Sequence, residues 1–139
     1  MTLRFLLDTA IVSAPIAKTP NRRVVKRLEQ HGGHCAIAAP VWHELIYGAS
    51  RLPSGKRRTA LEDYLHRVVR SSFPVLAYDE AAAEWHGKER ARLEDEGRTP
   101  PFVDGQIAAI ASTHSLVLVT SNTKDFRAFA GLETTDWTT

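Results

Sequence analysis

The stretch PFVDGQIAAIA, at residues 101–111, decides how the rest of this chain is interpreted. Its opening proline is typical of a helix start, because the proline ring fixes the backbone angle that a first helical turn needs. Ile107, Ile110 and Ala111 then recur at spacings of three and four, which predicts a helix that buries one apolar stripe against a core. Asp104 falls in the first turn of this helix. The sequence therefore predicts a carboxylate held in place by a packed helix.

A short strand and a polar loop are expected directly after this helix. Residues 116–120 form an apolar run of strand type, and Asn122 and Asp125 follow in the loop. An acid on a helix beside a strand that ends in polar side chains is a plausible start for a ligand or catalytic site. Such a site needs further polar side chains from other parts of the chain.

Length and composition indicate one folded domain over residues 1–139. The chain has 139 residues, of which 43% are hydrophobic and 24% charged, and this length is sufficient to bury a core without metal or disulfide staples. The single cysteine, Cys35, excludes an intramolecular disulfide and a zinc cluster built on cysteines. The sequence has no apolar run near the roughly 20 residues of a membrane span and no signal peptide, so we expect a cytoplasmic protein without membrane contact.

Basic residues are clustered although the formal net charge is only +2. The two clusters consist of Arg22, Arg23, Lys26 and Arg27, and of Arg51, Lys56, Arg57 and Arg58. Such clusters can neutralise phosphates, although for any one cluster a solvated face of a helix is the more common explanation. Composition alone does not separate the two interpretations.

Strand-like and helix-like segments alternate along the chain. Strands are expected at residues 3–9, 35–39, 74–77 and 116–120, and helices at 22–31, from 40 to about 50, at 57–71, 80–96 and 101–111, with a helical turn at 125–129 and a further edge strand in the tail. This alternation predicts an α/β domain with three layers, α/β/α, around a mainly parallel sheet.

Four acids fall where such a topology gathers side chains at one edge of the sheet, namely Asp8, Glu44, Asp104 and Asp125. Carboxylates in close proximity repel one another and require protons or cations to coexist. Oxygen ligands favour Mg²⁺ or Mn²⁺ over zinc, and such ions can activate water for attack on a phosphodiester. From spacing alone, each single acid can also be a helix cap or a solvated charge.

Four segments give this pattern a family context. FLLDT at 5–9, VWHELIYG at 41–48, FVDGQIAAIA at 102–111 and LVTSNTKDF at 118–126 resemble, in this order, the signature segments of PIN-domain ribonucleases, in particular the VapC-type toxins of type II toxin–antitoxin systems. The resemblance implies an endoribonuclease that depends on Mg²⁺ or Mn²⁺ and hydrolyses RNA with metal-activated water. It also implies a small antitoxin partner, which in this family usually binds DNA.

The resemblance assigns residues to the expected site. Asp8, Glu44 and Asp104 match the three acids of the family, and Thr120 matches the threonine that braces them. Thr9 is expected to form a side-chain hydrogen bond at the end of the first strand.

The family pattern leaves the fourth metal ligand open. Many relatives have an acid where this chain has Asn122, and others have asparagine there with an acid three residues later, as Asp125 is here. The fourth ligand is therefore Asp125, the amide oxygen of Asn122, or a water held by either. Ala10 stands where relatives often have asparagine, so no side-chain hydrogen bond is expected from that position.

Two further expectations concern partners and activity. Ile46 and Tyr47, on the helix that carries Glu44, are expected to help dock the antitoxin or a second copy, in a homodimer or a hetero-oligomer with the antitoxin. The alternative to a nuclease is a catalytically weak PIN module that binds RNA or protein without cleaving. A phosphoacceptor signalling domain is disfavoured, because Asp8 has no acidic neighbour.

Overall fold

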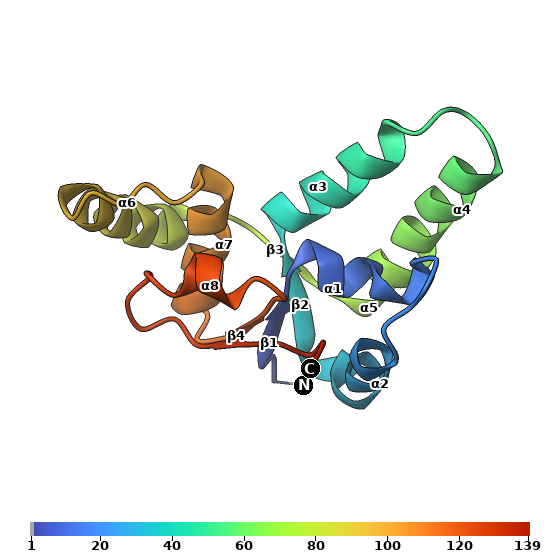
Figure 1. The fold of residues 1–139 in the computed structure, drawn as a ribbon, viewed down its shortest axis with the longest axis horizontal. Coiled ribbons are helices and arrows are strands. Elements are labelled where there is room, and N and C mark those ends of the chain that lie inside the picture. Colours follow the sequence, from blue (N-terminus) through green and yellow to red (C-terminus); the bar gives the residue numbers. More distant parts are fainter. Residues whose placement is uncertain (1) are drawn as a thin grey trace.

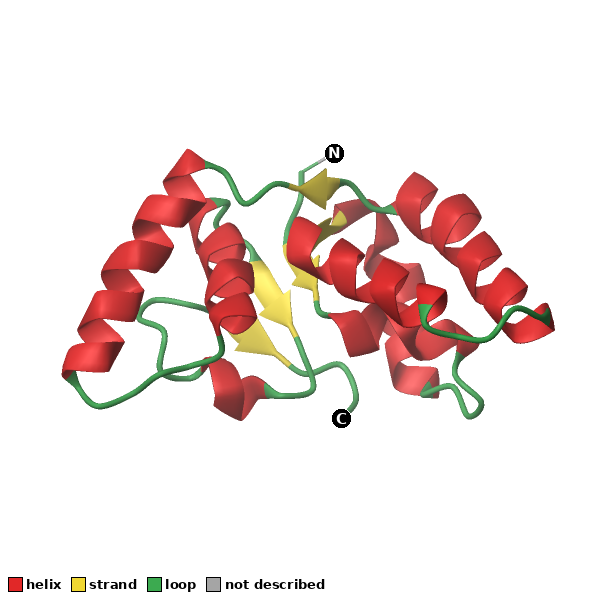
Figure 2. Cartoon of the chain, turned by 90° about the horizontal axis from the view of Figure 1, so that it is seen from above, coloured by secondary structure: helices red, strands yellow, loops and turns green. Residues whose placement is uncertain are grey.

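The structure, a computed structural model that describes residues 2–139, has helices packed on both faces of a central sheet (Figures 1 and 2). Within these residues the sheet has five strands in the order β3-β2-β1-β4-β5, and all neighbours pair in parallel. The strands are β1 (Phe5–Leu7), β2 (Cys35–Ala38), β3 (Val75–Leu76), β4 (Val117–Val119) and β5 (Thr134–Thr135). The predicted three-layer α/β class is confirmed.

The central strand β1 is buried on both faces of the sheet. Its residues are all buried, and Leu6 pairs with Ala36 on one side and with Leu118 on the other. A parallel strand covered on both faces needs apolar side chains throughout, which is what the sequence supplies.

The helices divide between the two faces. Figure 1 shows α1 to α5 on one side of the sheet and α6 to α8 on the other. They are α1 (Thr9–Ser13), α2 (Arg22–His31), α3 (Ala39–Ser50), α4 (Lys56–Tyr64), α5 (Arg70–Ser72), α6 (Glu80–Asp95), α7 (Phe102–Thr113) and α8 (Thr123–Phe126), with 3₁₀ turns η1 (Ala14–Ile16) and η2 (Gly32–His34) and a π-helical turn η3 (Leu65–Val69). No helix within residues 2–139 is long and apolar enough to cross a membrane.

Most predicted elements are present, with three corrections at their boundaries. The first strand ends at Leu7 rather than Thr9, because the Asp8 carboxylate accepts a 2.8 Å hydrogen bond from the backbone N–H of Thr9 and caps α1. The helix expected over 57–71 is interrupted by η3. The last helical turn begins at Thr123, two residues before the predicted start.

A glycine allows α6 and α7 to pack closely. A Cβ built on Gly105 would lie 2.6 Å from Cδ2 of His86 and closer still to its Nε2, so no other residue fits there without a shift. His86 is buried on α6, and its Nδ1 is 2.8 Å from the hydroxyl of Tyr78. This contact fixes the first turn of α7, where Asp104 lies.

Candidate active site

The strand order reverses between β1 and β4, which is where ligands bind in open parallel sheets. Asp8 directly follows β1 and Thr120 directly follows β4. The Thr120 hydroxyl donates a 2.8 Å hydrogen bond to Oδ2 of Asp8, and the Asp8 N–H donates a 2.9 Å bond to the carbonyl of Val119. The two strand ends are thereby joined by side chain and backbone.

Asp8 is held from two directions. Its Oδ1 accepts the N–H of Thr9, and its Oδ2 accepts the hydroxyl of Thr120. Because both oxygens have a donor, the carboxylate is fixed in orientation. The side chain remains half-buried, so part of it faces the solvent.

Glu44 joins this group from α3. It lies in the second turn of that helix, and its Oε2 accepts a 2.8 Å hydrogen bond from the hydroxyl of Thr9. Thr9 therefore connects the N-terminus of α1 to an acid 35 residues away. This matches the expected hydrogen-bonding role of Thr9.

Thr120 also organises the loop that follows β4. Its side chain is fully buried, and its Oγ1 accepts a 3.0 Å hydrogen bond from the backbone N–H of Asn122. The carbonyl of Asn122 accepts the N–H of Asp125 at 3.0 Å, at the start of α8. Asn122 and Asp125 are both exposed, so their side chains are accessible at this edge.

The pKa of Asp104 reflects both its burial and the charges of the other acids. Burial first, and then the negative charges of Asp8, Asp125 and Glu44, raise the pKa of Asp104 to about 6. A charge acts in this way only over a short range in water, so these three charges lie within reach of the Asp104 carboxyl, as the predicted site requires.

The acids do not form a complete metal-binding site in this conformation. Among residues 2–139, no three Asp, Glu, His or Cys side chains lie close enough to bind one ion with the rotamers they have. Glu44 is turned toward Thr9, and Asp8 toward its two donors.

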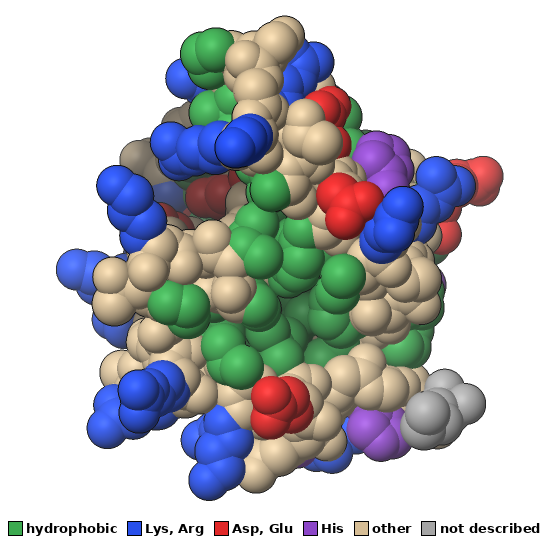
Figure 3. All heavy atoms as spheres, turned by 90° about the vertical axis from the view of Figure 1, so that its right-hand side faces the viewer, with side chains coloured by type: hydrophobic (Ala, Val, Ile, Leu, Met, Phe, Trp, Pro, Cys, Tyr) green, Lys and Arg blue, Asp and Glu red, His purple; other side chains and the backbone are tan. Residues whose placement is uncertain are grey.

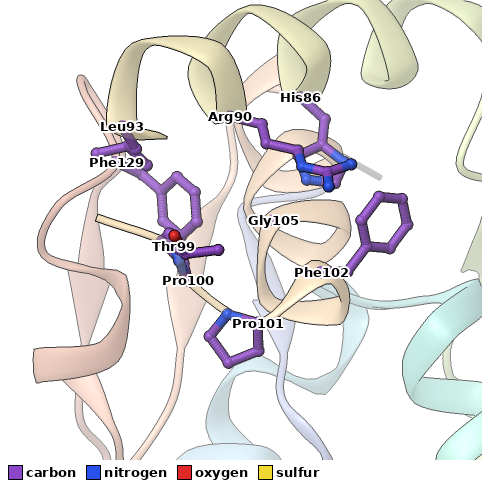
Figure 4. Close-up of a pocket in the computed structure, with 9 residues that line it drawn as sticks. All are labelled: His86, Arg90, Leu93, Thr99, Pro100, Pro101, Phe102, Gly105 and Phe129. Carbon is purple, nitrogen blue, oxygen red and sulfur yellow. The ribbon is translucent and has the colours of Figure 1, made fainter. Parts of the chain in front are cut away.

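A separate cavity lies between α6 and α7 (Figure 4). It measures about 120 Å³, and its walls include His86, Arg90, Phe102 and Gly105. Phe102 and Gly105 are three residues apart and share one face of α7, whereas Asp104 is two residues from Phe102 and lies near the opposite face. The cavity is therefore distinct from the acidic edge.

Sequence reasoning missed the contact of His86 with Gly105. The signal was a glycine directly after Asp104 inside a predicted helix, where glycine costs up to about 1 kcal/mol relative to alanine. Such a glycine indicates close packing, but its partner is 19 positions away (105 − 86) and only the fold reveals it.

Comparison with known proteins agrees with this fold. Residues 5–132 match the PIN domain family. The chain is 37% identical to the tRNA(fMet)-specific endonuclease VapC of Shigella flexneri, over 97% of this chain and 98% of that protein. It is 32% identical to toxin FitB of Neisseria gonorrhoeae, over 88% and 91% of the two chains.

A solved structure of FitAB bound to an IR36 DNA fragment contains a chain that superimposes with a TM-score of 0.87 at 28% identity, covering 97% of this chain and 96% of the other. The matched family and both relatives extend over nearly the whole chain. The chain therefore belongs to the PIN domain family, in which it is a homologue of the VapC-type ribonuclease toxins.

Proposed function

We propose that residues 1–139 form a single PIN domain that cleaves RNA at the edge shared by Asp8, Glu44, Asp104 and Asp125. The observation that carries this proposal is the pair of side-chain hydrogen bonds at the ends of the strands, from Thr120 to Asp8 and from Thr9 to Glu44. Burial, and then the charges of Asp8, Asp125 and Glu44, also raise the pKa of Asp104. Carboxylates that repel one another where the strand order of a parallel sheet reverses are typical of a functional site.

The donor set fits a hard divalent cation. PIN-domain nucleases depend on divalent metal ions as a class, and all the candidate ligands here are oxygen atoms, which Mg²⁺ and Mn²⁺ prefer. Asp8, Glu44 and Asp104 would hold the ion, with Asn122 or Asp125 completing the set. When bound, such an ion lowers the pKa of water and stabilises the leaving oxygen of a phosphodiester.

The protein's own residues position this chemistry. Thr120 and the Thr9 backbone keep the Asp8 carboxylate in one orientation, while the Thr9 hydroxyl restrains Glu44. His86 fixes the first turn of α7 and thereby Asp104. Preorganised ligands of this kind reduce the rearrangement needed at the moment of reaction.

The substrate is RNA, and tRNA is the first class to test. One relative is named for cleaving tRNA(fMet), and it covers this chain almost completely. Because cellular RNA would be the target, we place the action of this protein in the cytoplasm.

We further propose an antitoxin partner, as the resemblance to FitAB and the toxin FitB supports. Figure 3 shows hydrophobic side chains gathered in the middle of one face, with Lys and Arg around them. A hollow of about 350 Å³ between η1 and α4 is lined by Ile16, Ala17, Ala60 and Leu61, together with Ser13 and Arg57. It suits the apolar side of a small partner, either in a hetero-oligomer or beside a second copy of the toxin.

The test of the partner surface is copurification from coexpression with the neighbouring small gene product. Ala60→Glu puts a charge into the hollow from an exposed position of α4 and should reduce copurification. Ala83→Glu, at an exposed position of α6, is the matched control. Equal recovery of the partner with both variants would refute this location.

The test of the nuclease is cleavage of tRNA and total RNA, with end mapping, in Mg²⁺, in Mn²⁺ and in chelator. The parent should cut only with metal. Asp8→Asn and Asp104→Asn should not cut, while Asp95→Asn, at the exposed end of α6, should cut like the parent. A parent chain that binds RNA but never cuts it would favour the alternative of a binding-only PIN module.

A further inference from the structure

Three side chains form a row along α3, which we call the α3 ladder: His43, Tyr47 and Arg51. They are spaced four residues apart, so they lie on one side of the helix. The rings of His43 and Tyr47 are 6.2 Å apart and only 22° from parallel, and Cζ of Arg51 lies 5.3 Å from the centre of the Tyr47 ring. The α3 ladder thus consists of two aromatic rings followed by a guanidinium group.

Tyr47 is not a core residue. It is 56% exposed, whereas its neighbour Ile46 is half-buried and packs against the hydrophobic core. The expectation that Ile46 helps to dock a partner therefore has little exposed surface to support it. Tyr47 presents an aromatic surface to the solvent, and a rigid ring with only two side-chain torsions loses little freedom when it binds.

The α3 ladder starts beside the acidic edge. Tyr47 is one helical turn beyond Glu44, the acid that is bonded to Thr9. Figure 1 shows α3 running from the carboxyl end of β2 away from the sheet toward the loop before α4. From Glu44 to Arg51 the helix advances about 10 Å. A strand of RNA entering the acidic edge would follow this helix.

The charge beyond the ladder is complementary to RNA. Arg51 is followed by Lys56 and Arg57, and within residues 2–139 none of these three has a carboxylate within ion-pair distance, whereas Arg58 pairs with Glu62 at 3.4 Å. Figure 3 shows Lys and Arg side chains near the top of the molecule, where α3 leads into α4. Cations without internal partners are available to phosphates.

We propose that the α3 ladder is a binding track for single-stranded RNA, in which Tyr47 stacks on a base and Arg51 binds a phosphate. The proposal rests on the ribonuclease function proposed above and adds to it the side chains that hold the substrate. Aromatic stacking combined with backbone cations is the general means by which proteins bind single strands without reading their sequence.

Phe102, on α7, provides a matched control. It is 51% exposed, Cζ of Arg90 lies 5.4 Å from its ring centre, and the His86 ring is 4.8 Å away. Its surroundings resemble those of Tyr47 in composition. Its side chain leaves α7 toward His86 and the cavity rather than in the direction of Asp104, so we expect it not to contact RNA bound at the acidic edge.

The experiment measures binding of a labelled, short single-stranded oligoribonucleotide to the full chain by fluorescence anisotropy in chelator, so that no cleavage is needed. Tyr47→Leu should weaken binding about 5- to 100-fold, and Tyr47→Phe should keep nearly parent affinity because stacking is retained. Arg51→Gln should lower the slope of log affinity against log salt by about 0.7, the value for one phosphate on a single strand. Phe102→Leu should bind like the parent.

The proposal would be overturned if Tyr47→Leu bound RNA with the affinity of the parent. This holds also if that variant no longer binds the antitoxin, because Tyr47 would then serve the protein partner and not RNA. Equal losses in Tyr47→Phe and Tyr47→Leu would also overturn it, because the ring would then not be the binding element. The outcome is separable from that of the nuclease test. If the parent cuts RNA and Tyr47→Leu binds RNA with parent affinity, only the proposed binding track is refuted. If the parent binds RNA through Tyr47 but does not cut it, only the proposed nuclease function is refuted.

Discussion

The hydroxyl of Thr120 donates a 2.8 Å hydrogen bond to Oδ2 of Asp8, and it thereby links two residues 112 positions apart in the sequence. The same oxygen accepts the N–H of Asn122 at 3.0 Å. Since Thr120 is fully buried, a water molecule cannot easily take the place of its hydroxyl if that group is lost. The first acid of the candidate site and the loop after β4 therefore depend on one side chain.

Thr120→Val keeps the shape of this residue but removes both bonds. We expect a loss of about 1–3 kcal/mol in the free energy of unfolding, because Asp8 and the N–H of Asn122 lose their partner. RNA cleavage should fall as well, since Asp8 is no longer held. Urea unfolding and a cleavage assay measure the two effects. Thr113→Val is the control, because Thr113 is exposed and bonds only to carbonyls of its own helix. Equal effects of both substitutions would contradict this role of Thr120.

Gly105→Ala tests the packing of α7 on α6. Alanine favours a helix over glycine by up to about 1 kcal/mol, but the new Cβ would overlap His86, and overpacking of this kind costs about 1–3 kcal/mol. We expect net destabilisation and weaker cleavage, because Asp104 follows any movement of α7.

Two controls separate overlap from helix propensity. Gly87→Ala, in α6 with nothing within 4 Å of its added Cβ, should be neutral or stabilising. The double variant Gly105→Ala/His86→Ala should be more stable than the sum of its single changes predicts. Strict additivity in a thermal unfolding series would show that the two residues do not compete for space.

The raised pKa of Asp104 predicts a dependence of stability on pH. The folded chain holds the Asp104 proton up to about pH 6, whereas the ordinary pKa of an aspartate side chain is 3.8. Between these values the folded state binds more protons than the unfolded state, so this residue reduces stability as the pH rises through the window. Asp104→Asn should therefore stabilise the chain at pH 7 by about 1 kcal/mol, a value reduced for solvent screening of a half-buried group.

The measurement is the difference in unfolding free energy between parent and Asp104→Asn in chelator from pH 3.5 to 7.5. The difference should grow across the window and level off above it. A constant difference would mean that folding does not raise the pKa of Asp104.

Arg92 connects α6 to the segment after α8. It donates to both oxygens of Glu89 at 2.7 and 2.9 Å and to the carbonyl of Ala128 at 3.0 Å, while Glu89 accepts the N–H of Ala130 at 2.8 Å. These bonds, above all that from Arg92, lower the pKa of Glu89. A lysine cannot reproduce this paired geometry.

Arg92→Lys should therefore destabilise the chain by about 1–2 kcal/mol. The lowered pKa means that Glu89 stabilises the fold above its unfolded pKa, and that this contribution is lost as the pH falls through the folded value. Glu84→Gln removes the exposed ion pair with Lys88 and should change stability by less than about 0.5 kcal/mol. Chemical denaturation of both variants at pH 7 and pH 4 is the measurement, and similar changes in the two would count against the role of Arg92.

The sequence predicted the elements with strong periodicity and missed those decided by tertiary contacts. The helix at 22–31 has the predicted bounds, and α6 begins at the predicted Glu80. The early end of β1 depends on the Asp8 carboxylate competing for the next backbone N–H, which an apolar run does not reveal. The π-helical turn η3 interrupts a regular helical pattern and has no local signal that we recognise.

The end of the first strand predicted the place of Asp8, and the family resemblance assigned Thr120 to bracing the acids. The hydrogen bond from Thr120 to Asp8 agrees with that assignment. The bond from Thr9 to Glu44 joins residues on different helices, and its formation depends on how α1 and α3 pack. Hydrogen bonds between distant side chains are set by tertiary geometry, which sequence spacing does not encode.

The central claim is that acids from separate segments form one divalent-cation site. The most direct measurement is calorimetric titration of the chain with Mn²⁺, comparing the parent with Asp8→Asn, in which asparagine can still cap α1. The account predicts that the parent binds Mn²⁺ and that Asp8→Asn binds it about tenfold more weakly or worse. Equal affinity in the two proteins, or no binding by the parent, would contradict it.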